Sequence, residues 1–508
     1  MPGMDASTIN LPTACKNNYL YIQSSNMKVL LIASECAPLV KVGGIADVIG
    51  SLPLALESIG VDARIVIPYY KPLLDAVNFK LIKTFLVNFA GIDENVSVHE
   101  TKLSNSNVTV YLLKNDKYIS NGGIYFSPQH MASPDEELDR FAFFSKAVCR
   151  IFSYNNDIFN ADIFHCNDWH TGLIPQLLQS MHNYNKSQIL KTIFTIHNLA
   201  YQGFTKTDIA QKLDININSD QSLKWDATDD NLDMVLQGIV GADYITTVSE
   251  KYAEEIQTSE FGEGLHEILE SRKNRLKGIL NGISYEVFDP SKDPYIKANY
   301  THGDVISGKQ KNKLSLQKEL GLTINQNTPL IGIITRLASQ KGLNLVSDSL
   351  ENICESGHQV VLLGNGDPLL EEIFKQANYK PSLKGKFKGL IQFSEKMARK
   401  IYASSDMFLI PSKYEPCGLT QMIAMKYGTV PIVRATGGLF DTVSDKETGF
   451  SFIEFSSNAL LNSIMRASEL YKNKGNWNKM VQKCMSQDFS WTQSAKKYAS
   501  LYQKVLNL

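Results

Sequence analysis

The sequence lacks an excess of charge of either sign. Its 508 residues include 51 basic and 52 acidic side chains, which leaves a formal net charge of −1. A surface that binds nucleic acid or an anionic membrane depends on a strong positive field, so neither partner is expected. Any phosphate that the protein binds must be held locally, by a few placed lysine or arginine side chains and by backbone amides.

Paired cysteines are also missing. The seven cysteines are scattered and none belongs to a C-x-x-C pair: they are Cys15, Cys36, Cys149, Cys166, Cys354, Cys417 and Cys484. This pattern argues against a disulfide framework and against a zinc ribbon. It favours a reducing compartment, and we expect a cytoplasmic protein.

Long hydrophobic runs and targeting signals are absent too. Apolar runs such as Val29–Ala33 have the length of a buried strand, far below the about 20 residues that span a bilayer. We therefore expect no membrane segment. Residues 1–26 contain one basic side chain, Lys16, and no apolar core, so they resemble neither a signal peptide nor an arginine-rich transit peptide. We expect them to form a loosely ordered extension.

What the sequence does contain is an alternation of short, β-rich apolar runs with stretches of helical periodicity. This alternation is typical of parallel strands joined by crossover helices. The expected strands are Lys28–Ala33, Ala63–Ile67, Val108–Leu113, Asp162–Cys166, Thr192–His197, Tyr244–Val248, Leu330–Thr335, Gln359–Leu363, Leu390–Phe393, Met407–Ile410 and Val430–Val433. Because the alternation runs through both halves, the predicted fold class is α/β, with two Rossmann-like domains.

A division between the two domains is expected after Ile283, where the periodicity stops and a polar stretch follows. The N-terminal domain would cover 27–283 and the C-terminal domain 284–488. Over 489–508 a last helix is expected, capped by Thr492, with its apolar residues on one face: Ala495, Tyr498, Tyr502 and Val505. Ligands of such two-domain chains bind where the carboxyl ends of the strands face one cleft.

The loop after the first expected strand has the sequence Lys-Val-Gly-Gly-Ile-Ala-Asp-Val over 41–48. Gly43 and Gly44 let backbone amides approach a ligand closely, and the start of the next helix favours anionic oxygen. Lys41 adds a positive charge and Asp47 a carboxylate. Taken alone, the motif fits equally well a purely structural turn in which Asp47 stabilises the helix dipole.

Two segments follow neighbouring strands: His-Cys-Asn-Asp-Trp-His-Thr-Gly over 165–172 and Thr-Ile-His-Asn-Leu-Ala-Tyr-Gln-Gly over 195–203. They concentrate imidazole, amide, carboxylate and aromatic groups, which suit the hydroxyls and ring faces of a polyhydroxylated ligand. The candidates are Asp168, His170, His197, Asn198, Tyr201 and Gln202. A metal held by His165 and His170 is the alternative, but their spacing matches neither H-E-x-x-H nor a zinc finger.

In the second half, Arg336 and Lys341 follow the first expected strand. Two cations there could hold a pyrophosphate and take up the charge of a departing nucleotide. Considered in isolation, they are more simply ordinary surface charges.

The richest segment is Pro-Ser-Lys-Tyr-Glu-Pro-Cys-Gly-Leu-Thr-Gln over 411–421. Glu415 lies at a strand end, and Gly418-Leu419-Thr420 opens a helix whose amides could receive phosphate. Cys417 has no histidine near it in the sequence, so a catalytic thiol is not expected.

Together these motifs resemble those of bacterial glycogen synthase and plant starch synthase. The resemblance runs in the same order from about Met27 to the C-terminus, through residues 41–48, 168–172, 196–203, 336, 340–342 and 415–421. It implies a GT-B glycosyltransferase fold, whose last helix crosses back onto the N-terminal domain. It also implies transfer of glucose from ADP-glucose to the non-reducing end of an α-1,4-glucan such as glycogen, with retention of anomeric configuration and without a metal.

The resemblance assigns roles to single residues. The implied catalytic set is Asp47, His197, Arg336, Lys341 and Glu415. Arg336 and Lys341 would neutralise the diphosphate leaving group, and Glu415 would hold hydroxyls of the glucose. The implied substrate contacts are Lys41, Gly43, Gly44, Asp168, His170, Asn198, Tyr201, Gln202, Cys417, Gly418, Leu419 and Thr420. Of these, Lys41 and the Gly44 amide would meet the phosphates, as would Gly418, Leu419 and Thr420.

The sequence departs from the family pattern at four places, of which Ile45 for the usual leucine is a conservative change. Asn167 stands where a histidine is frequent, Ser284 where an aspartate usually follows Asn-Gly-Ile, and Ile423 where related transferases have a second glutamate. Two rival functions stay open: a glucan-binding protein without catalysis, and a related retaining transferase that uses UDP-glucose.

Overall fold

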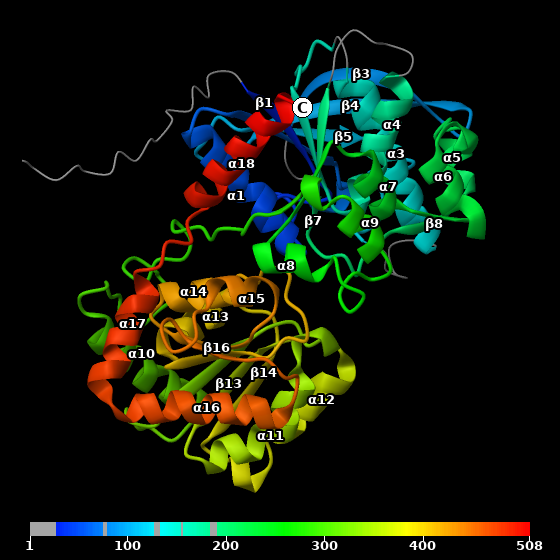
Figure 1. The fold of residues 1–508 in the computed structure, drawn as a ribbon. Helices are drawn as coiled ribbons and strands as arrows, with labels where there is room; N and C mark the ends of the chain where they lie inside the picture. The colour runs from blue at the N-terminus through cyan, green and yellow to red at the C-terminus, as the bar shows by residue number, and fades with distance from the viewer. Residues whose placement is uncertain (1–26, 75–78, 126–132, 154–155, 183–189) are drawn as a thin grey trace, which may run out of the picture.

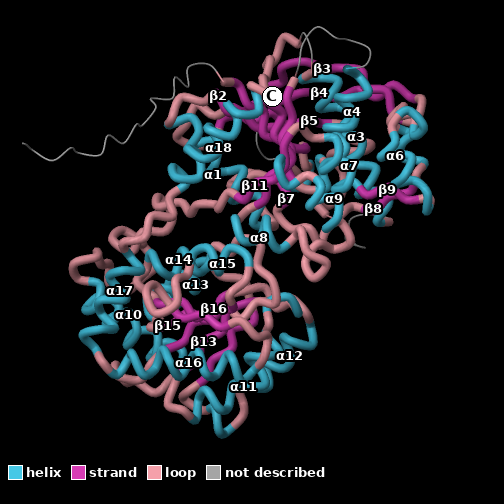
Figure 2. Tube along the Cα trace, viewed as in Figure 1, coloured by secondary structure: helices cyan, strands magenta, loops and turns pink. Residues whose placement is uncertain are grey.

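The computed structural model describes residues 27–74, 79–125, 133–153, 156–182 and 190–508. These residues form two lobes, each with one large β-sheet and helices around it (Figures 1 and 2). The expected extension over 1–26 lies outside the described residues. The two Rossmann-like domains predicted from the alternation are confirmed.

The N-terminal sheet has nine strands: β1 (Lys28–Ile32), β2 (Asp62–Pro68), β3 (Lys80–Phe89), β4 (Ile92–Lys102), β5 (Thr109–Lys114), β6 (Ile163–Asn167), β7 (Lys191–Ile196), β10 (Tyr244–Thr247) and β11 (Leu276–Gly278). Their order across the sheet is β11-β10-β7-β6-β1-β2-β5-β4-β3. The helices of this half are α1 (Gly44–Ser58), α2 (Lys71–Leu74), α3 (Pro134–Phe152), α4 (Leu173–His182), α5 (Asp208–Lys212), α6 (Gln221–Asp226), α7 (Met234–Gly241), α8 (Glu250–Glu255) and α9 (His266–Ser271). A short ribbon pairs β8 (Phe204–Lys206) with β9 (Asn231–Asp233).

The sequence pattern missed the long hairpin of β3 and β4, which runs antiparallel at one edge of this sheet. Its two strands are joined by Ala90 and Gly91, both with positive φ, as a tight two-residue hairpin turn requires. Much of β3 is exposed, with the burial pattern of an edge strand. An exposed edge strand carries no continuous apolar run, so it could not be found by a search for buried parallel strands.

The C-terminal sheet has six parallel strands: β12 (Leu330–Ile334), β13 (Gln359–Gly364), β14 (Phe387–Ile391), β15 (Met407–Ile410), β16 (Val430–Arg434) and β17 (Phe450–Phe452). Their order is β14-β13-β12-β15-β16-β17. Helices of this half are α10 (Val305–Leu320), α11 (Leu343–Glu355), α12 (Pro368–Ala377), α13 (Glu395–Ser404), α14 (Thr420–Lys426), α15 (Gly437–Thr442), α16 (Ser457–Lys472) and α17 (Lys474–Met485). The strand expected over Leu390–Phe393 in fact begins at Phe387 and ends at Ile391.

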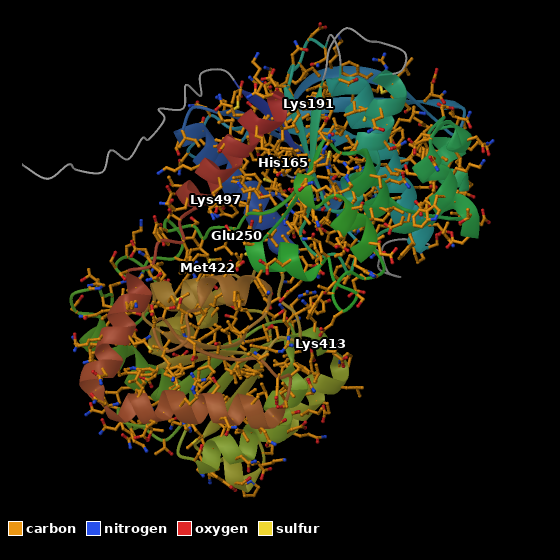
Figure 3. The ribbon with its side chains drawn as sticks, in the orientation of Figure 1. His165, Lys191, Glu250, Lys413, Met422 and Lys497 are labelled. Carbon is orange, nitrogen blue, oxygen red and sulfur yellow. The ribbon has the colours of Figure 1, made fainter. Side chains whose placement is uncertain are left out.

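The last helix, α18 (Trp491–Leu506), returns to the N-terminal lobe and packs on α1, so the expected crossing is confirmed (Figure 1). The residues expected on its apolar face, Ala495, Tyr498, Tyr502 and Val505, all belong to the core formed with α1, β1 and β2. Lys497 of this helix lies 3.0 Å from Glu250 of α8 (Figure 3). Thr492 is not its cap, because the helix already begins at Trp491.

The chain crosses between the lobes twice, and the two crossings lie side by side. The Ile283 amide donates to the carbonyl of Phe489 at 2.8 Å, and Ile283 bridges Ser490. A Cβ atom at Gly282 would lie 2.6 Å from the Trp491 backbone, so only glycine allows this close approach. Across the described ranges, no helix is both long and apolar enough to cross a membrane.

Among the hydrogen bonds that join α18 to the N-terminal sheet, that of Tyr502 is buried. The Tyr502 hydroxyl lies 2.8 Å from Nδ1 of His165, whose Nε2 lies 2.6 Å from the Thr195 hydroxyl. We expect Tyr502→Phe to lower the free energy of unfolding by about 1–3 kcal/mol, because a buried imidazole nitrogen is left without a partner. Urea unfolding measures this. Tyr379→Phe is the control, since Tyr379 is 86% exposed, and an equal loss in both variants would contradict the expectation.

Candidate active site

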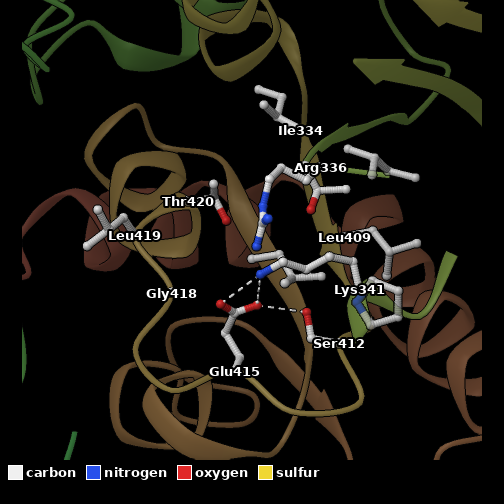
Figure 4. Close-up of a pocket in the computed structure, with 13 residues that line it drawn as sticks. Ile334, Arg336, Lys341, Leu409, Ser412, Glu415, Gly418, Leu419 and Thr420 are labelled. Carbon is white, nitrogen blue, oxygen red and sulfur yellow. Dashed lines mark hydrogen bonds and ion pairs between the residues drawn. The ribbon is translucent and has the colours of Figure 1, made fainter. Parts of the chain in front are cut away.

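A pocket of about 190 Å³ opens at the carboxyl edge of the C-terminal sheet (Figure 4). It lies between the loop after β12 and the loop after β15. Six of the residues predicted from the sequence line it: Arg336, Lys341, Glu415, Gly418, Leu419 and Thr420. The structure thus brings two cations, one carboxylate and a turn of backbone together, although the two loops are far apart in the sequence.

Glu415 and Lys341 form an ion pair inside this pocket. The Lys341 ammonium lies 2.7 and 2.9 Å from the two carboxylate oxygens of Glu415, and the Ser412 hydroxyl donates to one of them at 2.8 Å (Figure 4). Glu415 is buried, and its carboxylate is held in place by these three hydrogen bonds. The positive charge of Lys341 is therefore already partly balanced.

Arg336 differs from Lys341 in having no partner. Among the described residues its guanidinium makes no hydrogen bond or ion pair, and the residue is exposed at the pocket. An unpaired guanidinium can approach a phosphate without first giving up a carboxylate. The pocket therefore offers one uncompensated positive charge beside one compensated ion pair.

Gly418 is needed where the second loop turns into α14. Its φ of +68° is in the left-handed region, and a Cβ atom there would lie 3.1 Å from Cγ of Glu415. That Cβ atom would also lie 2.6 Å from the side-chain oxygen of Gln421, so a side chain at this position would push on both Gln421 and Glu415.

The loop between β1 and α1, residues 33–43, is organised by Glu35, which belongs to none of the sequence motifs. The buried carboxylate of Glu35 accepts hydrogen bonds from the Val42 amide at 2.5 Å, the Gly43 amide at 3.0 Å and the Tyr125 hydroxyl at 2.7 Å. The Gly43 amide thus donates within the loop, and a contact of Gly43 with the substrate stays a prediction. At Gly44, where α1 begins, a Cβ atom would meet nothing within 4 Å, so the backbone there is open.

Lys41 of this loop pairs with Asp47 in the first turn of α1. Their charged atoms are 2.7 Å apart and both side chains are well exposed. Neither lines the pocket of the C-terminal domain. The N-terminal candidates therefore form a second group, at the ends of β1, β6 and β7, which are neighbours in the sheet.

Asn167 and Asp168 hold His197. The amide nitrogen of Asn167 donates to two backbone carbonyls, so its oxygen must accept from Nε2 of His197, at 2.9 Å. The Asp168 carboxylate accepts from the His197 amide at 2.7 Å. Burial lowers the pKa of His197 to about 3, so the ring is neutral with its proton on Nε2. Asn167, which stands where the family frequently has a histidine, therefore supplies the oxygen that orients the His197 ring.

His170 lies in an aromatic cluster. Its ring is stacked on that of Trp169, with ring centroids 4.1 Å apart, and meets the ring of Phe141 edge-on, with centroids 4.6 Å apart. It is buried, and its Nδ1 has no partner among the described residues.

His165 is not available to a metal, because both of its nitrogens face hydroxyl groups. Over the described part of the chain, no group of three or more His, Cys, Asp or Glu could hold a metal ion. A reaction without a metal stays a prediction.

The remaining candidates lie where the two lobes meet. The side chain of Asn198 lies near Tyr414 of the C-terminal domain, and Tyr201 is exposed. The Gln202 amide group donates to the Glu263 carbonyl at 2.9 Å, so its nitrogen is engaged within its own domain. Burial raises the pKa of the Cys417 thiol to about 12, which agrees with the expectation that it is not a catalytic thiol.

Family models match both halves of the chain. The model of the starch synthase catalytic domain matches residues 28–271, and that of glycosyl transferases group 1 matches residues 317–483. Among solved structures, the catalytic domain of starch synthase IV from Arabidopsis thaliana, bound to ADP and acarbose, superposes with a TM-score of 0.84 at 32% identity, covering 95% of this chain and 100% of that one. Sucrose-phosphate synthase from Thermosynechococcus elongatus shares the fold at a TM-score of 0.58 and 17% identity, covering 95% of this chain and 100% of that one.

The fold and the two family models define a two-domain glycosyltransferase. The names of curated relatives indicate which family of glycosyltransferases this is. A glycogen synthase of Clostridium acetobutylicum is 41% identical and one of Lactococcus lactis is 40% identical, each covering 94% of this chain and 100% of the relative. The chain belongs to the glycogen synthase and starch synthase family, as its motifs predicted.

Burial raises the pKa of Asp168 to about 7, although the His197 and Asn198 amides oppose this rise. A raised pKa in the folded state means that this group favours folding at low pH and that the contribution is lost as pH rises towards 7. Relative to wild type, Asp168→Asn should therefore gain about 1–3 kcal/mol of stability between pH 5 and pH 8. Unfolding at the two pH values measures this, and a constant difference between the two proteins would contradict it.

Proposed function

We propose that this chain elongates an α-1,4-glucan by transferring glucose from ADP-glucose to its non-reducing end, with retention of anomeric configuration and release of ADP. The observation that carries this is the pocket in which Arg336 and Lys341 lie beside Glu415. The names of the curated relatives support a glycogen-like acceptor. The ADP and acarbose bound to the Arabidopsis starch synthase support an adenine donor and a glucan-like acceptor.

The pocket suits the charge separation of this reaction. Breaking the bond between glucose and phosphate leaves an oxocarbenium-like sugar and a more negative nucleotide. Arg336 and Lys341 would stabilise the departing diphosphate, and the amides of Gly418, Leu419 and Thr420 would add donors. Glu415, held by Lys341, would accept hydrogen bonds from hydroxyls of the glucose.

The N-terminal domain would supply the opposite wall. Lys41 and the open Gly44 backbone would approach the phosphates, so Lys41 would exchange its pairing with Asp47 for the donor. Asp47 and the neutral His197 would face the transferred glucose. Asp168, His170, Asn198, Tyr201 and Gln202 would line the acceptor side.

A cytoplasmic location stays a prediction. Its support is that the six cysteines of the described residues are all free and buried.

The decisive experiment supplies glycogen with radiolabelled ADP-glucose or UDP-glucose and follows label in the polymer. We expect incorporation from ADP-glucose and much less from UDP-glucose. Preferred use of UDP-glucose would overturn the donor assignment. Binding of glycogen without incorporation from either donor would overturn the transferase function.

We expect Lys341→Ala and Arg336→Ala to lower turnover by about 10² to 10³, equivalent to about 2–4 kcal/mol of transition-state stabilisation. Affinity for glycogen, measured by affinity electrophoresis, should stay unchanged, since neither cation contacts the acceptor. Lys375→Ala on α12 serves as the control, because Lys375 pairs only with its helical neighbour Glu371 at the surface. Equal losses of turnover and glucan affinity would refute the leaving-group role.

A further inference from the structure

Helix α8 of the N-terminal domain packs against α15 of the C-terminal domain (Figure 1). At this junction the carboxylate of Glu255 accepts from the Thr436 hydroxyl at 3.1 and 3.3 Å. It also accepts from the Gly437 amide at 3.0 and 3.1 Å. Glu255 is only 8% exposed, so a charged group of one domain is buried against a turn of the other.

The turn that Glu255 holds is in contact with the backbone of Glu415. The Gly438 amide donates to the Glu415 carbonyl at 3.0 Å. At Gly437, where φ is +45°, a Cβ atom would lie 2.0 Å from that carbonyl oxygen. The turn and the Glu415 backbone are therefore packed without any spare room, and a shift of one must move the other.

A second contact from the same helix reaches the next residue of the loop. The Ser249 hydroxyl donates to the Pro416 carbonyl at 2.5 Å and accepts from the Tyr252 amide at 3.1 Å, which caps α8. The N-terminal domain thus holds two consecutive carbonyls of the loop, that of Pro416 directly and that of Glu415 through the turn.

The carboxylate of Glu255 suits its surroundings, because both of its oxygens lie within hydrogen-bond distance of the two donors. The Gly437 amide and the Thr436 hydroxyl both donate to it, and burying either group without an acceptor is costly. Lys251 and Arg434 are the cations near enough to favour the charged form, although burial raises the pKa of Glu255. In Glu255→Gln an amide nitrogen would replace one of the two oxygens and would face the N–H group of Gly437, and only the remaining oxygen could accept from the two donors.

We propose that Glu255 is a positioning residue for Glu415, and that through the Thr436–Gly438 turn it makes the geometry of the donor pocket depend on how the two domains are joined. This role rests on the proposed function, in which Glu415 contacts the transferred glucose. Glu255 itself touches no substrate; it acts through the backbone of the loop.

The same junction contains a residue, Asp441, that links the two domains without bonding to the Glu415 loop, and it serves as a matched control. The Asp441 carboxylate of α15 accepts from the Lys251 amide at 2.9 Å, so it too links the two domains. Asp441 is exposed, and within the described part of the chain no hydrogen bond or ion pair joins its carboxylate to residues 411–421. Glu254, the exposed neighbour of Glu255, pairs with Lys251 on its own helix and serves as a local control.

The test compares Glu255→Gln with Asp441→Asn and Glu254→Gln in the full chain, with ADP-glucose and glycogen as substrates. We expect Glu255→Gln to lower kcat at least tenfold and to change KM for ADP-glucose less than twofold, because Arg336 and Lys341 are untouched. The two controls should keep wild-type kcat. Glu255→Asp, which keeps the charge, should recover part of the loss.

A second readout does not depend on activity. Hydrogen exchange of the amides in residues 411–421, followed by mass spectrometry, should become faster in Glu255→Gln and not in Asp441→Asn. If Glu255→Gln does not fold, Thr436→Val replaces it, since that variant removes one of the donors and leaves the Gly437 amide paired. We expect about a threefold loss of kcat from it, with faster exchange in the same segment.

The inference is overturned if Asp441→Asn loses as much kcat as Glu255→Gln, or if neither kcat nor exchange changes in Glu255→Gln and Thr436→Val. The wild-type arm tests the proposed function separately. Absence of transferase activity in the wild-type protein would contradict the proposed function. Hydrogen exchange of the amides in residues 411–421 would still show whether Glu255 positions the loop.

Discussion

Parallel strands joined by crossover helices must all end at the same edge of their sheet, and every functional group of this protein depends on that constraint. In the N-terminal sheet the adjacent strands β1, β6 and β7 deliver three polar loops to one edge. In the C-terminal sheet the adjacent strands β12 and β15 deliver Arg336, Lys341 and Glu415 to another. Residues from distant parts of the chain therefore meet without any loop having to be long.

Charge compensation is the second theme of the site. Lys341 is paired with Glu415 and Lys41 with Asp47, whereas Arg336 has no partner within the described residues. Pairing keeps a cation and a carboxylate in defined positions at little electrostatic cost. A dianionic donor could then bind the unpaired Arg336 together with Lys341 and Lys41, whose side chains are already oriented by their carboxylate partners. A chain with almost equal numbers of acidic and basic residues can in this way present strong local charge to a small ligand while its surface stays nearly neutral.

The two domains are not independent supports for this chemistry. The chain crosses between them at Ile283 and Ser490, and α18 closes the N-terminal core with residues from the very end of the sequence. At the α8–α15 junction the carboxylate of Glu255 reaches a turn that is packed on Glu415. The relative placement of the domains and the geometry of the donor pocket are thus physically linked, which a site contained in one domain would not require.

The sequence by itself determined the class of fold, the approximate place of the buried parallel strands, the family, and which side chains stand at strand ends. These features are local: apolar runs, turn glycines and short motifs report the conformation of neighbouring residues. The edge hairpin of β3 and β4 was missed because exposed strands leave no such run. Tertiary structure alone decided which groups pair. Lys341 meets Glu415 across 74 positions, Glu255 meets Gly437 across 182 and His165 meets Tyr502 across 337. Such contacts depend on how whole helices and sheets pack, so no local pattern can encode them.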